Sequence, residues 1–214
     1  MRTIKVDAVS SLKVRPDTTN IILRISRVSD SYDLAIEESS KDSSDIKDML
    51  ASLGFKRDSL KTISFDIDTR YESYRDKNND YKRRFIGYGY TQELSFSFLN
   101  DNEVLSKILY MLSKGKVDAE IRLQYTISNV DLYINKAILE ASKKANSRAS
   151  LIASSLNLSL GNIVDISYSD SDNNMSVGNF SLCDSAPRLM CSKVDIEPDD
   201  IEINKSIRII YEII

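Results

Sequence analysis

Polar and apolar residues alternate over long stretches of the chain, which is the pattern of a strand with one buried face. The stretches are residues 3–14, 20–28, 60–71, 85–98, 117–127 and 201–214, with a shorter one at 162–168. Along the last long stretch, alternation predicts a single face made of Ile201, Ile203, the aliphatic stem of Lys205, Ile207, Ile209 and Tyr211. Pro16 and Asp17 follow the first stretch as in a type I turn, so we expect an opening hairpin.

Three other segments repeat apolar residues at helical spacing, and they span about residues 31–53, 101–114 and 131–156. Asp30 or Ser31 is expected to cap the first helix, which Gly54 ends. The middle of that helix, residues 38–45, is polar on all sides. We therefore expect this part to face solvent and to be weakly held.

The third helix carries alanine at every fourth position, at Ala137, Ala141, Ala145, Ala149 and Ala153. Small side chains let a helix backbone approach a sheet or another helix closely. Adding larger residues predicts a core face of Ile134, Ile138, Ala141, Ala145, Ala149, Ile152 and Leu156. The favoured interpretation is burial against the protein's own core; the alternative is a groove for a partner helix.

Strands outnumber helices and do not alternate strictly with them, which favours an α+β fold. We predict a mostly antiparallel sheet with about three helices packed on one side, as a single domain over residues 1–214. Residues 171–199 are rich in Ser, Asn and Asp and weak in periodicity, which predicts a long, partly mobile loop. Cys183 and Cys191 lie in this polar segment; we expect reduced thiols, with a small-loop disulfide as the alternative in an oxidising compartment.

The amino-acid composition argues against several classes of function but does not identify one. The 214 residues carry a formal charge of −3, which gives no net attraction for nucleic acid or an anionic membrane. The absence of histidine excludes Ser-His and Cys-His nucleophile systems and the commonest transition-metal ligand. The chain has no secretory signal pattern and no apolar run long enough for a membrane span. We expect a cytoplasmic protein, or a periplasmic or cell-surface one if a signal was removed.

Candidate chemistry begins with Asp66 and Asp68, which share the polar face of one predicted strand. Two such carboxylates could bind a cation or act as general acid and base, but they are also what the wet face of an amphipathic strand carries. Residues 87–89, "GYG", lack the third glycine and the following helix of a phosphate-binding loop. No catalytic, metal-binding or cofactor-binding residues are therefore predicted.

The connection at 70–84 is the strongest local mixture of aromatic and basic residues. Its candidate interaction residues are Tyr74, Arg75, Tyr81, Arg83 and Arg84. Three interpretations remain: a solvated hairpin, a contact between subunits, since tyrosine and arginine are enriched at interfaces, or a surface for single-stranded nucleic acid. Asp76 and Asp80 dilute the positive charge and make nucleic acid the least favoured of the three.

Four segments together resemble the SIMPL-domain family. They are "VDAVSSLKVRPDTTNIILRIS", "LKTISFDIDTRYESY" continued by "FIGYGYTQELSF", "NKAILEASKKANSRASLIASSLNLSLGNIVDIS" and "EPDDIEINKSIRIIYEI". The chain departs from the family pattern near Ala8, often glycine, at Thr18 or Thr19, often alanine, and in lacking a secretion signal. The resemblance implies an α+β fold, a largely bacterial protein of unassigned biochemical function and, for some members, a large ring-like homo-oligomer; it supplies no catalytic residues.

These observations favour a non-enzymatic protein that self-associates and acts through its surfaces, using an edge strand and the hairpin tip at 72–84. Two alternatives from other classes remain open. One is a histidine-independent, carboxylate- or cation-dependent hydrolase using Asp66 and Asp68, and the other is single-stranded nucleic-acid binding through residues 70–84.

Overall fold

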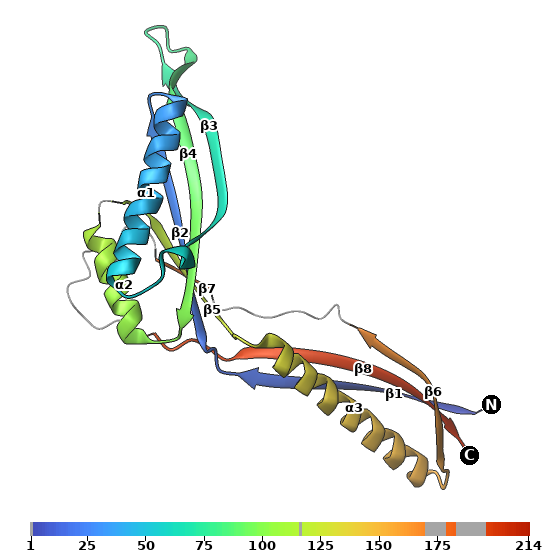
Figure 1. The fold of residues 1–214 in the computed structure, drawn as a ribbon. Coiled ribbons are helices and arrows are strands. Elements are labelled where there is room, and N and C mark those ends of the chain that lie inside the picture. Colours follow the sequence, from blue (N-terminus) through green and yellow to red (C-terminus); the bar gives the residue numbers. More distant parts are fainter. Residues whose placement is uncertain (1, 116, 170–178, 183–195) are drawn as a thin grey trace. The chain divides into compact units, whose positions relative to one another are not determined.

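The computed structural model describes residues 2–115, 117–169, 179–182 and 196–214 (Figure 1). Contacts along the chain group it into two compact units. The terminal unit contains residues 1–17, 126–178 and 198–214, and the central unit contains residues 18–125 and 179–197. Each unit is assembled from segments far apart in the sequence. That the whole chain forms a single domain stays a prediction.

The central unit is built on a five-stranded sheet with the order β3-β4-β2-β5-β7. The strands are β2 (Thr18–Ser29), β3 (Lys61–Arg75), β4 (Tyr81–Leu99), β5 (Glu120–Thr126) and β7 (Asn179–Leu182). Helices α1 (Tyr32–Ser52) and α2 (Asn102–Lys114) and the short 3-10 helix η1 (Arg57–Ser59) complete it. Ala35, Ile46 and Leu50 of α1 and Leu105 and Ile108 of α2 share one core with the inward side chains of the sheet. Both helices therefore cover the same face of the sheet.

The terminal unit is a three-stranded antiparallel sheet with the order β1-β8-β6 and one long helix. Its elements are β1 (Thr3–Val14), α3 (Val130–Ser155), β6 (Leu160–Ser169) and β8 (Ile201–Ile213). The predicted face of β8 is confirmed: all six of its residues are buried. They include Lys205, which is only 1% exposed, with its ammonium 5.9 Å from the centre of the Tyr168 ring.

The predicted opening hairpin is wrong, although both of its strands form. β1 pairs with β8 over its full length, from Thr3 to Val14, whereas β2 pairs with β4 in the other sheet. The Asp17 carboxylate accepts hydrogen bonds from the Ser128 backbone N–H at 2.7 Å and from its hydroxyl at 2.6 Å, and the Asp17 N–H donates to Thr126 O at 3.2 Å. The Pro-Asp segment is thus tied to the chain after β5 and passes from one sheet to the next.

The alanine row of α3 is buried against its own unit, as the favoured interpretation predicts. Each of the five alanines is between 0% and 3% exposed, and Ala141, Ala145 and Ala149 pack on β1 and β8. The predicted larger members Ile152 and Leu156 are instead exposed, at 42% and 63%. Residues four apart on an α-helix are separated by about 40° around the helix axis. The alanine row therefore winds slowly around α3. The usual twist of the strands lets the sheet follow the row along its length.

The α+β, mostly antiparallel fold is confirmed, but its strands are divided between two sheets, where one sheet was predicted. Strand β7 lies inside the segment predicted to be a loop. Most of that loop, with Cys183 and Cys191, lies outside the described residues. In the part of the chain that the structure covers, no helix combines the length and the apolar character needed to cross a membrane.

Replacing Ala145 by leucine should destabilise the protein by roughly 1 to 3 kcal/mol, because the larger side chain has no space between α3 and the sheet. Urea unfolding measures this change. Ser147→Leu introduces the same residue on the exposed side of α3 and should change stability by less than about 0.5 kcal/mol. Equal effects of the two substitutions would contradict the close packing of the alanine row.

Candidate functional site

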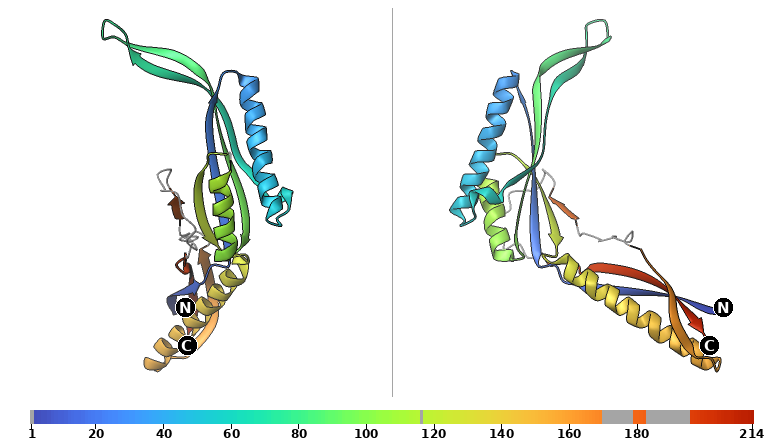
Figure 2. Two further views of the ribbon diagram at one scale, coloured as in Figure 1. Left: turned by 90° about the vertical axis from the view of Figure 1, so that its left-hand side faces the viewer. Right: turned by 45° about the vertical axis from the view of Figure 1, so that its right-hand side comes forward.

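The hairpin of β3 and β4 continues beyond the rest of its sheet. Pairing of β2 with β4 ends at Ser29 and Tyr88, whereas β3 and β4 stay paired out to Arg75 and Tyr81. Figure 2 shows this two-stranded extension passing the N-terminal end of α1. We call residues 71–86 the arm. A two-stranded ribbon has little core of its own, and every side chain of the arm is exposed except the half-buried Asp76.

A β-bulge marks the point where the arm begins. Arg70 pairs with Gly87, but the next residue, Tyr71, pairs with Phe85, so Ile86 is an additional residue in β4. Gly87 has φ 138°, and a Cβ there would lie 2.4 Å from the carbonyl oxygen of Ser29. Only glycine meets both conditions without strain. The bulge therefore bends β4 where β2 ends.

One face of the arm is aromatic and basic. Cross-strand pairing places Tyr71 with Phe85, Ser73 with Arg83, and Arg75 with Tyr81 on this face, which we call the aromatic face. It continues the sheet face that α1 covers, because Phe85 contacts Tyr88 with ring centres 5.4 Å apart and Tyr88 contacts Tyr32 of α1 at 6.0 Å.

The tip of the arm is held by local polar contacts. Arg75 donates to Tyr81 Oη at 2.6 Å and to Asn79 Oδ1 at 3.0 Å, and its guanidinium carbon lies 4.5 Å from the centre of the Tyr81 ring. Asp76 Oδ1 accepts from the N–H groups of Asn78 and Asp80 at 2.8 and 3.1 Å. The ion pair with Lys82, at 2.6 Å, and these turn hydrogen bonds lower the pKa of Asp76. The tip is therefore a structured turn.

The predicted interaction residues all lie on the arm but not on one face. Arg75, Tyr81 and Arg83 lie on the aromatic face, whereas Tyr74 and Arg84 lie on the other. There Arg84 is paired with Glu72 at 2.7 Å. No ion pair of Arg83 occurs within the described ranges. Of the three arginines of the arm, Arg83 therefore has the guanidinium most available to a partner.

The carboxylate pair proposed for catalysis is solvent-exposed. Asp66 and Asp68 lie on β3 opposite Thr91 and Gly89, and Asp68 forms an ion pair with Arg70 at 2.9 Å. The Arg70 side chain lies over Gly89, where a Cβ would be 2.3 Å from Arg70 Nε. Among the residues that can be described, no group of three or more Asp, Glu or Cys side chains is placed to hold a metal ion. The pair therefore has the surroundings of a solvated strand face.

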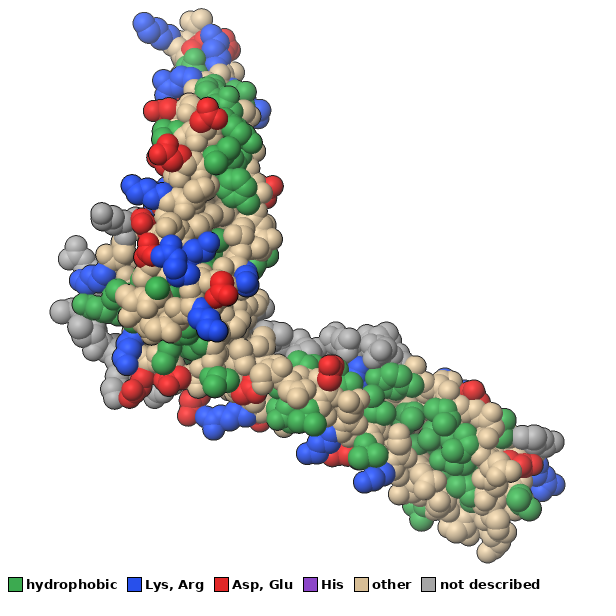
Figure 3. Space-filling model, in the orientation of Figure 1, with side chains coloured by type: hydrophobic (Ala, Val, Ile, Leu, Met, Phe, Trp, Pro, Cys, Tyr) green, Lys and Arg blue, Asp and Glu red, His purple; other side chains and the backbone are tan. Residues whose placement is uncertain are grey.

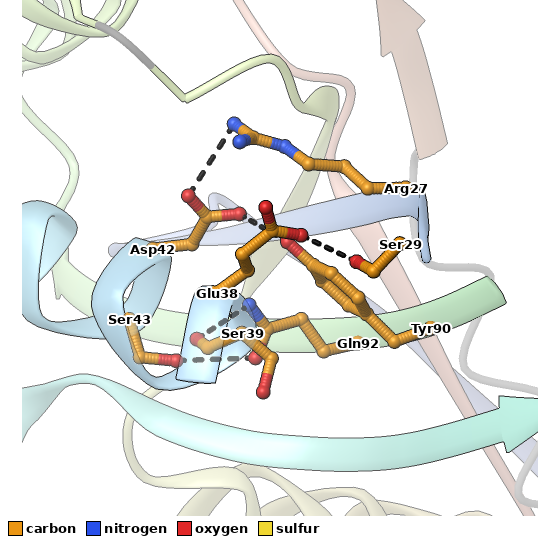
Figure 4. A network of polar contacts seen from close by, with 8 residues as sticks. All are labelled: Arg27, Ser29, Glu38, Ser39, Asp42, Ser43, Tyr90 and Gln92. Carbon is orange, nitrogen blue, oxygen red and sulfur yellow. Dashed lines mark hydrogen bonds and ion pairs between the residues drawn. The ribbon is translucent and has the colours of Figure 1, made fainter. Parts of the chain in front are cut away.

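A buried polar network joins α1 to the sheet (Figure 4). The Tyr90 hydroxyl donates to Asp42 Oδ2 at 2.6 Å, and Arg27 Nη2 lies 3.3 Å from Asp42 Oδ1. Nearby, Gln92 Nε2 donates to Ser39 O at 3.2 Å, and the Ser43 hydroxyl donates to Gln92 Oε1 at 3.1 Å. Figure 4 also shows the hydrogen bond from Ser29 to Glu38. Asp42 is 4% exposed and has a donor at each carboxylate oxygen, which compensates for its burial.

This network contradicts the expectation that residues 38–45 face solvent. Ser39 and Asp42 are buried because they continue the stripe that Ala35, Ile46 and Leu50 form on α1. Their partners Tyr90 and Gln92 stand at inward positions of β4, so polar residues meet polar residues inside the core. The helical spacing of Ser39 and Asp42 relative to Ala35 and Ile46 is visible in the sequence and indicates burial. The prediction of solvent exposure rests instead on the polar composition of residues 38–45.

Comparison with known proteins assigns the family. Residues 4–211 match the model of a family described as SIMPL, protein of unknown function (DUF541). The chain belongs to the SIMPL family. The resemblance carried by its four segments is thereby confirmed over nearly the whole chain. No curated protein matches this SIMPL chain.

Replacing Tyr90 by phenylalanine in this SIMPL protein should lower its stability by roughly 1 to 3 kcal/mol, because the buried Asp42 carboxylate loses a donor. Urea unfolding measures the change. Tyr110→Phe removes a hydroxyl from a tyrosine that is 50% exposed and should have little effect. Equal losses in the two variants would contradict the role of the network.

The same variant should show a distinctive pH dependence. Burial, and then the hydrogen bond to Asp42, raise the pKa of the Tyr90 phenol above its ordinary value of 10. As pH rises past 10, the unfolded chain loses this proton before the folded protein does, so wild-type stability falls. The stability difference between wild type and Tyr90→Phe should therefore shrink above pH 10 relative to pH 8. A constant difference would contradict the raised pKa.

Proposed function

We propose that this SIMPL protein acts without catalysis, through self-association and protein-protein contacts made by the edge of β3 and by the arm. The observation that carries the proposal is the position of β3 at the end of its sheet. This strand is 15 residues long, contains no proline and has no buried side chain. None of the described strands pairs with its outer edge, so the backbone groups there are available for another strand to add.

The composition of the arm supports the same function. Tyr71, Tyr74, Tyr81 and Phe85 are between 43% and 75% exposed, although large aromatic side chains normally gain most from burial. Tyrosine and arginine are also the residues that most often carry binding energy at protein interfaces. Figure 3 shows hydrophobic side chains gathered along the β3–β4 pair beside α1, with charged side chains at the tip.

Single-stranded nucleic acid is the second candidate for the arm. Its support is the alternation of rings and guanidinium groups on the aromatic face, where Arg83 lies between the Tyr81 and Phe85 positions. Bases can stack on such rings while arginine neutralises phosphates. Binding of this kind weakens steeply as salt increases, which distinguishes it from an interface dominated by apolar contacts.

Shortening the arm should abolish or strongly weaken self-association. The variant replaces residues 73–83 by Asn-Gly, a turn suited to a two-residue hairpin loop, and keeps the directly opposed Glu72 and Arg84. Light scattering after size-exclusion chromatography, over a series of protein concentrations, measures the result for wild type and variant.

Circular dichroism provides the control for this variant, because its core and therefore its melting temperature should be retained. A wild-type protein that stays monomeric at every concentration, or a folded variant that associates like wild type, would contradict the proposal. Salt-sensitive capture of a single-stranded oligonucleotide by wild type alone would instead favour the second candidate.

A further inference from the structure

The aromatic face of the arm continues a sheet face that α1 covers, but no helix of the described residues lies over the arm itself. Along the body of β4, helix α1 lies over the inward side chains, and Tyr90, Leu94 and Phe96 are almost fully buried. This helix begins at Tyr32, whose ring meets Tyr88. Beyond that point the same sheet face continues into the arm, where Tyr71, Phe85 and Tyr81 are 56%, 45% and 75% exposed. A second helix with a suitable surface could cover them as α1 covers β4.

The charge on the arm specifies what such a helix must carry. The arm contains five basic residues, Arg75, Lys77, Lys82, Arg83 and Arg84, against three acidic residues, Glu72, Asp76 and Asp80. Glu72 and Asp76 are already paired with Arg84 and Lys82. Arg83 stands among the rings of the aromatic face and has no ion pair with any residue that the structure describes. A complementary helix therefore presents carboxylates together with apolar side chains.

Helix α1 has such a surface on the side turned away from its own sheet. It contains six acidic residues, Asp33, Glu37, Glu38, Asp42, Asp45 and Asp48, and two basic ones, Lys41 and Lys47. Asp42 and Glu38 are engaged with the sheet and Asp48 with Arg57. Asp33, Glu37 and Asp45 are exposed, and no ion pair of theirs is found in the ranges described.

Apolar residues flank the free carboxylates of α1. Asp33 and Glu37 are four residues apart and so lie on the same side of the helix. Leu34 and Ile36 stand on either side of this acidic ridge and are 37% and 41% exposed. One helical turn thus offers carboxylates flanked by apolar side chains, which are complementary in charge and polarity to Arg83 and the rings of the arm.

We propose that the arm of one copy docks, through its aromatic face, on the exposed side of α1 of a second copy. Arg83 pairs with Glu37 of that copy, and Tyr71, Tyr81 and Phe85 pack over its Leu34 and Ile36. This docking rests on the proposed self-association and defines its two surfaces. Within one copy the arm extends past the start of α1, so its aromatic face is available to another molecule (Figure 2).

Exchanging charges between the two surfaces tests the docking in the full-length protein. Arg83→Glu and Glu37→Arg should each weaken self-association roughly tenfold, because each places like charges against each other. The double variant restores an opposite pair and should return the dissociation constant to within about threefold of wild type. Sedimentation velocity over a concentration series gives the constants. Lys107→Glu makes the same charge change as Arg83→Glu at an exposed site on α2 and should leave association unchanged.

The outcomes separate this docking from the self-association on which it rests. A monomeric wild type at all concentrations overturns both. A wild type that associates while the single variants associate equally well overturns the docking and leaves self-association standing. Weakened single variants without recovery in the double variant show that the arm binds elsewhere than α1, which also overturns it. If Arg83→Glu impairs only the capture of a single-stranded oligonucleotide, the aromatic face of the arm binds nucleic acid and the docking is wrong.

Discussion

The organisation of the central unit depends on one constraint, which is that an apolar sheet face must be covered to be stable in water. Helices α1 and α2 satisfy it for the body of the sheet, where the inward residues of β2 and β4 are almost fully buried. The arm is the part of the same face that α1 does not reach. Its exposed rings are the continuation of a core surface beyond its cover. A partner helix that buries these rings would extend to the arm the helix-on-sheet packing already present in the unit.

The polar network holds this helical cover in place. Asp42 is buried and finds its donors on Tyr90 of β4 and Arg27 of β2. Sliding α1 by one turn, about 5.4 Å, would move this carboxylate away from both donors and leave a buried charge uncompensated, at a cost of several kcal/mol. The network therefore holds α1 at the position along the sheet where the two-residue connection from β2, Asp30 and Ser31, lets it begin. This position in turn sets how much of the β3–β4 pair α1 leaves uncovered.

What could be predicted from the sequence is the part that local pattern determines. Alternation gave the buried face of β8, including the unusual Lys205, and the cap at Ser31 is confirmed by its hydrogen bond from the Leu34 N–H at 3.2 Å. The row of alanines in α3 likewise predicted close packing. In each case the information lies within a few residues of the feature.

Pairing partners are not local and were predicted less well. Pro16 and Asp17 suit a tight hairpin, yet the choice between hairpin and crossover depends on β8, almost two hundred residues away. Burial of Asp42 similarly depends on Tyr90, which lies 48 positions further along the chain. The arm residues were found because composition alone marks them. Which face of the arm continues the face covered by α1 follows from the bulge at Ile86 and Gly87, which alternation alone does not reveal.

Geometry limits the assemblies that the proposed docking can form. The arm and the acidic side of α1 belong to the same unit, so each copy carries both of the surfaces that meet in the proposed docking. If two copies dock reciprocally, both surfaces are used and a closed dimer results, with the same patches contributed by each partner. If docking runs in one direction only, every added copy leaves one arm and one α1 available, and growth stops only when the rotation between neighbours closes a ring. In the proposed docking, the direction in which the arm leaves the sheet at the bulge, relative to the acidic side of α1, therefore sets whether copies pair reciprocally or join in one direction.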